Sequence, residues 1–150
     1  MFYVMLLPGL LCGAAVSVTD LRSRRVPRRW VAAGYALQLV ALTAWCVATN
    51  QLFTAMVAVV ISLGAAVLQL LLGLIRPGSL GFGDVTTTLV VGLSVGAAGW
   101  FAVLYWWLAM GVLGLATIGI GVRTGHDDVP FAPVITTAGA LGVALAAVTG

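Results

Sequence analysis

The sequence contains no lysine and no glutamate, and only 7% of its 150 residues carry a charge. Soluble globular domains are charged at about a quarter of their positions. By contrast, 62% of this chain is hydrophobic. These two features exclude an ordinary water-soluble fold, so we expect an integral membrane protein.

Cysteine and histidine are also scarce, which limits the chemistry that the chain can perform. Cys12 and Cys46 both fall in apolar stretches, and no C-x-x-C motif occurs, so neither a disulfide framework nor a zinc site is indicated. The single histidine, His126, leaves a serine or cysteine triad open, but without a local motif for one. One histidine and four aspartates give little support to metal ligation. We expect no metal and no other cofactor.

Long apolar stretches divide the chain into candidate membrane spans. A spanning helix needs about 20 mostly apolar residues. Charges and turn signals between the stretches place six spans at about residues 2–19, 30–48, 54–75, 84–99, 101–122 and 131–149. These spans use most of the chain. We therefore expect an all-α polytopic membrane protein in which residues 1–150 form one integral-membrane domain.

The arginines predict how these spans are oriented. They lie in or beside three of the predicted loops, at positions 22, 24, 25, 28, 29, 76 and 123. Six alternating spans put those three loops on one side of the membrane, which the positive-inside rule makes cytoplasmic. We expect a multi-pass protein of the cell inner (plasma) membrane with both termini outside, in contact with lipid and without a nucleic-acid partner.

Two of the four aspartates lie at the cytoplasmic ends of predicted spans. Asp20 ends the first span and Asp84 begins the fourth, so this topology puts both at the same membrane level. Ionisable residues within a membrane are costly and usually functional. Two neighbouring carboxylates tend to share one proton, so one can activate water while the other protonates a leaving amine. This pattern favours hydrolysis of a peptide bond without a covalent intermediate.

The residues around Asp84 suit such a role. Gly81 and Gly83 lack side chains, which would allow the backbone of a substrate to approach. Thr87 and Thr88 lie on the same face of the predicted helix as Asp84, and their hydroxyls could bond either to the carboxylate or back to helix carbonyls. The alternative interpretation is that Gly81-Phe82-Gly83 is only a turn and that Asp84 only caps the helix.

The stretch D-L-R-S-R-R-V-P from Asp20, followed downstream by G-F-G-D, resembles the type IV prepilin peptidase family. These are GxGD-type aspartic membrane proteases that cut prepilins and preflagellins. The later stretch D-D-V-P-F-A-P-V-I-T-T-A-G-A-L is similar to the family segment that opens the last helix. The resemblance implies that Asp20 and Asp84 are the catalytic pair and that Gly81 and Gly83 are the motif glycines. From the motifs and the helix face together, we expect the substrate-binding residues to be Gly81, Gly83, Thr87, Thr88, Pro130 and Pro133.

The chain departs from the family pattern at two places. Thr86 stands where the family usually has lysine, and Val26-Pro27-Arg28 stands where it tends to have Ile/Val-Pro-Asn. Arg76 is a candidate to supply the missing cation. Asp127 and Asp128 are candidates to attract a basic leader peptide, although a solvated loop is the simpler interpretation of that pair.

The chain also lacks the cysteine-rich insertion of larger, methylating family members, so the resemblance implies a short, peptidase-only form. The expected activity is cleavage of the leader peptide of type IV (Flp-like) prepilins or related pseudopilins by a membrane-embedded aspartic endopeptidase, at the cytoplasmic face. Two alternatives remain open. One is an inactive homologue that serves as a pilus or secretion assembly subunit, and the other is a small ion-coupled transporter.

Overall fold

The computed structural model describes residues 2–23, 26–75, 81–124 and 130–149. Within these ranges the regular structure is helical throughout. A short 3-10 helix, η1 (Phe2–Leu6), leads into six α-helices: α1 (Leu7–Ser23), α2 (Arg28–Ala48), α3 (Leu52–Ile75), α4 (Phe82–Ala98), α5 (Trp100–Thr124) and α6 (Ala132–Thr149). This confirms the expected all-α class, and the six spans agree with the prediction to within a few residues.

Among the described residues, five helices are long and apolar enough to cross a membrane. The exception is α4, which has 17 residues and is about 25 Å long at 1.5 Å per residue. It ends at Gly99, whose positive φ of 105° is a conformation that favours glycine and separates α4 from α5. The chain is therefore a polytopic membrane protein in which five of the described helices have the length of a span and α4 is a shorter apolar helix.

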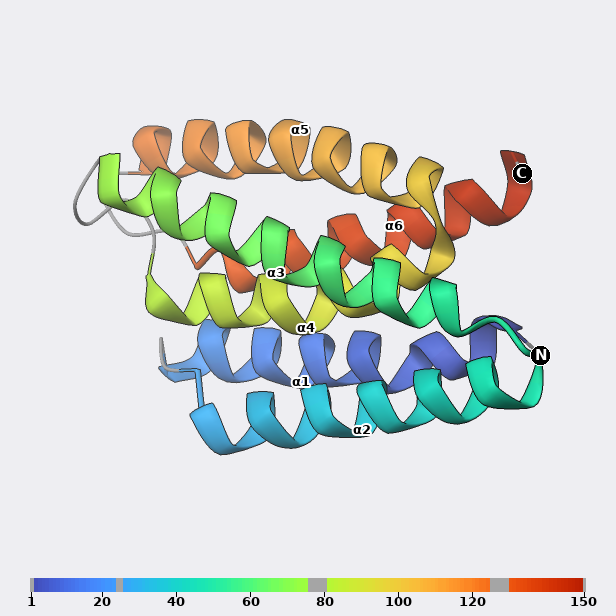
Figure 1. Cartoon of the computed structure of the whole chain (residues 1–150). Coiled ribbons are helices and arrows are strands. Elements are labelled where there is room, and N and C mark those ends of the chain that lie inside the picture. The colour runs from blue at the N-terminus through green and yellow to red at the C-terminus, as the bar shows by residue number, and fades with distance from the viewer. Residues whose placement is uncertain (1, 24–25, 76–80, 125–129, 150) are drawn as a thin grey trace.

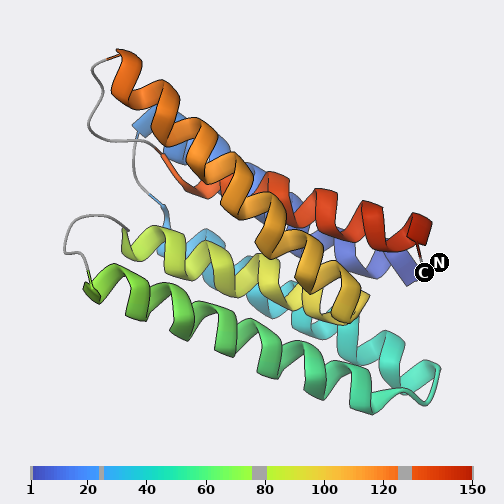
Figure 2. The same ribbon diagram turned by 90° about the horizontal axis from the view of Figure 1, so that it is seen from above.

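The short helix α4 is the centre of the bundle. It packs against each of the other five α-helices. Seen from above, it lies between α3 on one side and α1 and α6 on the other (Figure 2). Gly92 and Gly96 of α4 allow close packing on α3, because a Cβ atom at either position would lie within 3.2 Å of an α3 backbone atom. Protein surrounds α4 on most sides, so its length need not match the full thickness of the bilayer.

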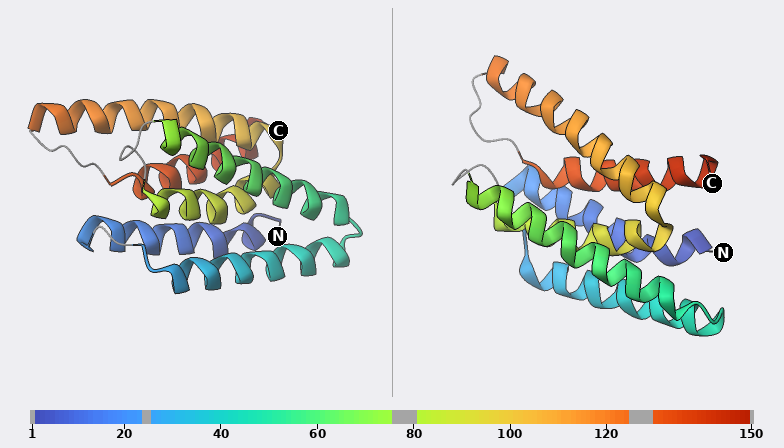
Figure 3. Two further views of the ribbon diagram at one scale, coloured as in Figure 1. Left: turned by 60° about the vertical axis from the view of Figure 1, so that its left-hand side comes forward. Right: turned by 45° about the horizontal axis from the view of Figure 1, so that its top comes forward.

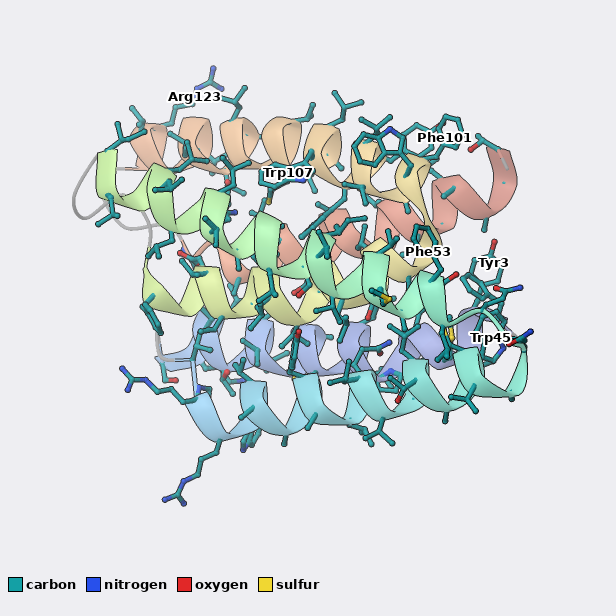
Figure 4. All side chains as sticks on the ribbon, viewed as in Figure 1. Tyr3, Trp45, Phe53, Phe101, Trp107 and Arg123 are labelled. Atoms are coloured by element: carbon teal, nitrogen blue, oxygen red, sulfur yellow. The ribbon has the colours of Figure 1, made fainter. Side chains whose placement is uncertain are left out.

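The two ends of the bundle differ in what they contain. Helices α1, α3 and α5 end, and α2, α4 and α6 begin, at one end, which we call the loop end (Figure 1). Both chain termini lie at the opposite end, which we call the terminal end (Figure 3). Tyr3, Trp45 and Phe53 gather at the terminal end, whereas Arg123 lies at the loop end (Figure 4). Which side of the membrane each end faces stays a prediction.

Toward the terminal end, buried polar side chains from the middle of α2 and the last two turns of α4 bond to the backbone where η1 meets α1. The Gln38 amide nitrogen donates to the carbonyl oxygen of Met5 at 3.0 Å, and its oxygen accepts from the N–H of Gly9 at 2.7 Å. Ser94 donates to the carbonyl oxygen of Leu6 at 3.1 Å. Gln38 and Ser94 are both fully buried. Their bonds therefore satisfy main-chain groups beside Pro8, a residue that has no N–H of its own.

Candidate active site

The structure brings the two predicted catalytic aspartates together at the loop end. Asp20 lies in the last turn of α1 and is only 9% exposed. Asp84 lies in the first turn of α4 and is half-buried. Helices α1 and α4 pack against each other, and the two carboxylates are close enough for their charges to repel. A pair of carboxylates held in this way is suited to sharing one proton.

Asp84 also takes part in the helix cap that sequence analysis left as an alternative. The residue at the N-cap position is Gly81, not Asp84. The Gly81 N–H donates to Asp84 Oδ2 at 2.9 Å, and the Asp84 N–H donates to the Gly81 carbonyl oxygen at 3.0 Å. This reciprocal pair of bonds orients the carboxylate, so the structural and the catalytic interpretations of Asp84 are compatible.

Gly83 packs against the segment that joins α1 to α2. A Cβ atom at position 83 would lie 2.6 Å from Cγ2 of Val26, so any side chain there would force Val26 or the first turn of α4 to shift. In this structure Val26 therefore fills the space that the sequence suggested for a substrate backbone. Gly81 is different, because it is exposed and a Cβ atom there would meet nothing closer than 3.6 Å. The substrate-binding roles of both glycines stay predictions.

A second contact joins the same two segments. The guanidinium carbon of Arg28, at the start of α2, lies 5.8 Å from the ring centroid of Phe82 in the G-F-G-D motif. Both side chains are exposed. Together with the contact between Val26 and Gly83, this interaction connects the beginning of α2 to the first turn of α4, where Asp84 lies.

The three consecutive threonines after Asp84 have different hydrogen bonds. Thr86 and Thr87 both donate to the carbonyl oxygen of Gly83, at 2.9 and 2.8 Å. Thr87 thus adopts one of the two arrangements expected from the sequence, the bond back to the helix. Thr88 adopts neither, because its hydroxyl is buried and has no hydrogen-bond partner in the part of the chain that the structure describes.

Helix α6 completes the loop end on the side of α1. Ser17 Oγ lies 3.1 Å from Thr136 Oγ1, and both residues are buried. This pair was not among the residues expected from the sequence, although Ser17 lies one helical turn before Asp20 and so shares its face. Pro130 and Pro133 flank the start of α6 and are half-buried. Their role in substrate binding stays a prediction.

The described residues contain no group of three or more histidine, cysteine or acidic side chains that could hold a metal ion. Arg76, His126, Asp127 and Asp128 lie outside the described ranges, so the structure does not address the roles considered for them.

Comparison with known protein families gives one match. The model of the type IV leader peptidase family matches residues 6–119. The chain belongs to this family. No curated protein and no solved structure matches it significantly.

The match to the type IV leader peptidase family includes the helices that carry both aspartates and the whole G-F-G-D motif. It confirms the family that the sequence motifs suggested, and it supports a peptidase-like function in a membrane protein. It ends within α5, before Pro130 and Pro133. The predicted role of Pro130 and Pro133 in substrate binding is therefore supported by local sequence similarity alone.

Proposed function

We propose that this protein is a membrane-embedded aspartic endopeptidase that removes the leader peptide of type IV (Flp-like) prepilins or related pseudopilins. The observation that carries the proposal is the proximity of Asp20 and Asp84, which come from different helices and meet at one end of the bundle. Family membership supplies the substrate class.

The chemistry follows from a carboxylate pair that holds one proton. The water oxygen adds to the carbonyl carbon of the scissile bond while one water proton passes to the ionised carboxylate. The protonated carboxylate gives its proton to the departing nitrogen as the C–N bond breaks. The pair again holds one proton after each cycle. The base and acid roles belong to the pair and are not assigned to either member.

The arginine distribution makes the loop end cytoplasmic in this proposal, with both termini outside the inner membrane. A substrate with its leader in the cytoplasm and its apolar helix in the bilayer then presents the leader junction at the depth of Asp20 and Asp84. Residues 1–150 act as one peptidase domain that contacts lipid and uses no cofactor and no nucleic acid.

The two alternatives receive unequal support. Thr86 in place of the family lysine favours an inactive assembly subunit, because a cation close to the aspartates is lost. A transporter would need a polar path through the bilayer. At the terminal end, however, the buried Gln38 and Ser94 are bonded to backbone groups. This arrangement gives an ion-coupled pathway no support.

The test is cleavage of a tagged Flp-type prepilin by wild type, Asp20→Asn and Asp84→Asn. Asparagine keeps the shape of aspartate but cannot act as a general base, so we expect at least a roughly 100-fold loss of leader removal in each variant. Ser23→Ala is the matched control, because Ser23 is exposed and lies one turn beyond Asp20. We expect it to cleave like wild type.

Cleavage that survives both asparagine substitutions would exclude the carboxylate pair as the catalyst. If folded wild type cleaves none of a panel of prepilins, Thr86→Lys becomes the deciding variant. Cleavage gained by Thr86→Lys would identify the natural chain as an inactive homologue. Elution as a single species in detergent verifies folding of every variant.

A further inference from the structure

The hydroxyl group of Thr88 has no hydrogen-bond partner in the described part of the protein. Burying a hydroxyl without a partner costs free energy, so its presence needs an explanation. Thr88 is fully buried, and among the described residues its Oγ1 atom makes no hydrogen bond. A valine would fill the same space without a polar atom. The hydroxyl therefore calls for a ligand that can bond to it, because buried polar groups in proteins are rarely left unpaired.

Local backbone geometry does not explain this hydroxyl. Thr86 and Thr87, the two preceding residues, each bond back to the carbonyl oxygen of Gly83. The same two types of bond from Thr88 would reach the carbonyl oxygens of Val85 and Asp84, and neither is made. The Thr88 side chain is thus oriented for a partner other than its own helix.

Helix periodicity places Thr88 one helical turn after Asp84, on the same face of α4. Val91 continues that face, and it packs against positions Gly13 of α1 and Gly139 of α6. The face therefore points toward α1 and α6, which also carry Asp20 and the Ser17–Thr136 pair. Hydroxyl groups thus form a layer one turn deeper in the bundle than the two carboxylates.

We propose that the Thr88 hydroxyl holds the water molecule that the Asp20–Asp84 pair consumes in hydrolysis. The hydroxyl can donate to or accept from a water that also contacts Asp84, since residues four apart on a helix lie about 5–6 Å apart at Cβ. Thr88 is then a positioning residue that supplies no proton to the reaction. This inference rests on the proposed function, and it adds a residue that selects the direction from which water attacks.

Two variants test the proposal. Thr88→Val removes the hydroxyl and keeps the shape, whereas Thr88→Ser keeps the hydroxyl and removes a methyl group. We expect Thr88→Val to lower kcat about tenfold with KM changed less than about twofold, because one hydrogen bond of ordinary strength is lost. We expect Thr88→Ser to retain most of the activity. Thr117→Val is the control, since the hydroxyl of Thr117 bonds to the Gly114 carbonyl in α5.

Thermal unfolding in detergent provides a readout that does not depend on activity. If the Thr88 hydroxyl binds water, valine removes a satisfied group, and the unfolding midpoint stays level or falls. If the hydroxyl is dry and unpaired, valine removes a burial cost and raises the midpoint by about 2 °C or more. A raised midpoint overturns the proposal, and it does so even if wild type cleaves no prepilin.

Activity decides which water is bound. Wild-type kcat in Thr88→Val overturns the assignment to the hydrolytic water, whatever the unfolding midpoint. A fall in kcat that Thr88→Ser shares equally also overturns it, because the hydroxyl is then not the group that matters. Loss of activity in the aspartate variants with normal kcat in Thr88→Val leaves the proposed function standing and this inference refuted.

Discussion

Buried polar side chains occur at both ends of this bundle, but they differ in what they bond to. At the terminal end, Gln38 and Ser94 bond to main-chain groups of η1 and α1. At the loop end, the Asp20 and Asp84 carboxylates lie close to each other, and Thr88 has no partner within the described ranges. The first set satisfies main-chain groups inside the protein, whereas the second set includes a polar atom whose partner must come from outside the described part of the protein.

This difference separates buried polar side chains with a structural role from those with a functional role. A buried hydroxyl without any partner would cost about 1–3 kcal/mol, and whole domains are stable by only about 5–15 kcal/mol. A buried polar group whose partner must come from outside the protein is therefore retained where activity needs it. Among the described residues, the loop end carries such a group, and the terminal-end side chains Gln38 and Ser94 do not belong to this class. We expect substitutions at the terminal end to lower stability and those at the loop end to lower cleavage.

The largest effect on stability is expected for Gln38→Leu. It removes the partners of two buried main-chain groups, the Met5 carbonyl and the Gly9 N–H. The free energy of unfolding should fall by about 2–4 kcal/mol, while cleavage per folded molecule stays near wild type. Denaturation in detergent measures the first and a cleavage assay the second.

The control for this substitution is Gln51→Leu, at an exposed glutamine in the turn between α2 and α3. Its expected change in stability is within about 0.5 kcal/mol. Equal losses in the two variants would mean that the bonds of Gln38 contribute nothing, and the contrast between the two ends would then fail.

A smaller effect is expected at Gly83, where the sequence and the structure suggest different reasons for the glycine. Gly83→Ala forces a methyl group against Val26, which costs about 1–3 kcal/mol and displaces the first turn of α4 with Asp84. We expect cleavage to fall about tenfold. The loss in the free energy of unfolding should be smaller than that of Gln38→Leu, because the first turn of α4 lies at the edge of the bundle.

Adding Val26→Ala to Gly83→Ala should restore part of the cleavage, since it removes the Cγ2 atom that the new methyl group would meet at 2.6 Å and leaves only the Cβ atom at 3.0 Å. The prepilin assay compares the two single variants with the double variant. A double variant as inactive as Gly83→Ala would instead mean that the substrate itself needs this space, as the sequence alone suggested.

The smallest effect is expected for Arg28→Gln. Its contact with Phe82 joins two exposed side chains, and such a cation–π interaction contributes about 0.5–1 kcal/mol. Cleavage should fall by about threefold or less, through looser placement of the G-F-G-D turn. Arg29→Gln, at the next exposed arginine, controls for charge. The same loss in both variants would point to a general effect of positive charge and not to the Phe82 contact.

Much of the loop end could be predicted from the amino-acid sequence. Alternation of six apolar stretches places Asp20 and Asp84 at one depth, and the helix spacing places Thr87 and Thr88 on the face of Asp84. The same reasoning could not tell that Thr87 bonds to its own helix while Thr88 does not. Both arrangements are allowed by helix geometry, and the choice depends on the helices packed against that face.

Trp106 illustrates the same limit at another position. The sequence offers no reason for a tryptophan deep in a predicted span. In the structure Trp106 is fully buried, and its Nε1–H donates to the carbonyl oxygen of Ile135 in α6 at 3.0 Å. A side chain with a polar atom is tolerated there because a helix that comes later in the chain supplies the acceptor.

The number and approximate bounds of the helices, their alternation and the depth of the two aspartates all follow from the order of the amino acids. Hydropathy, charge and chain breaks act locally along the chain, so they can be seen in a single sequence. Three other features depend on which helices become neighbours: Val26 lies against Gly83, Gln38 bonds to the backbone of η1 and α1, and Thr88 has no partner within the described ranges. Only the tertiary structure specifies these three features, because the apolar sequences of the helices do not reveal which pairs of helices pack closely against each other.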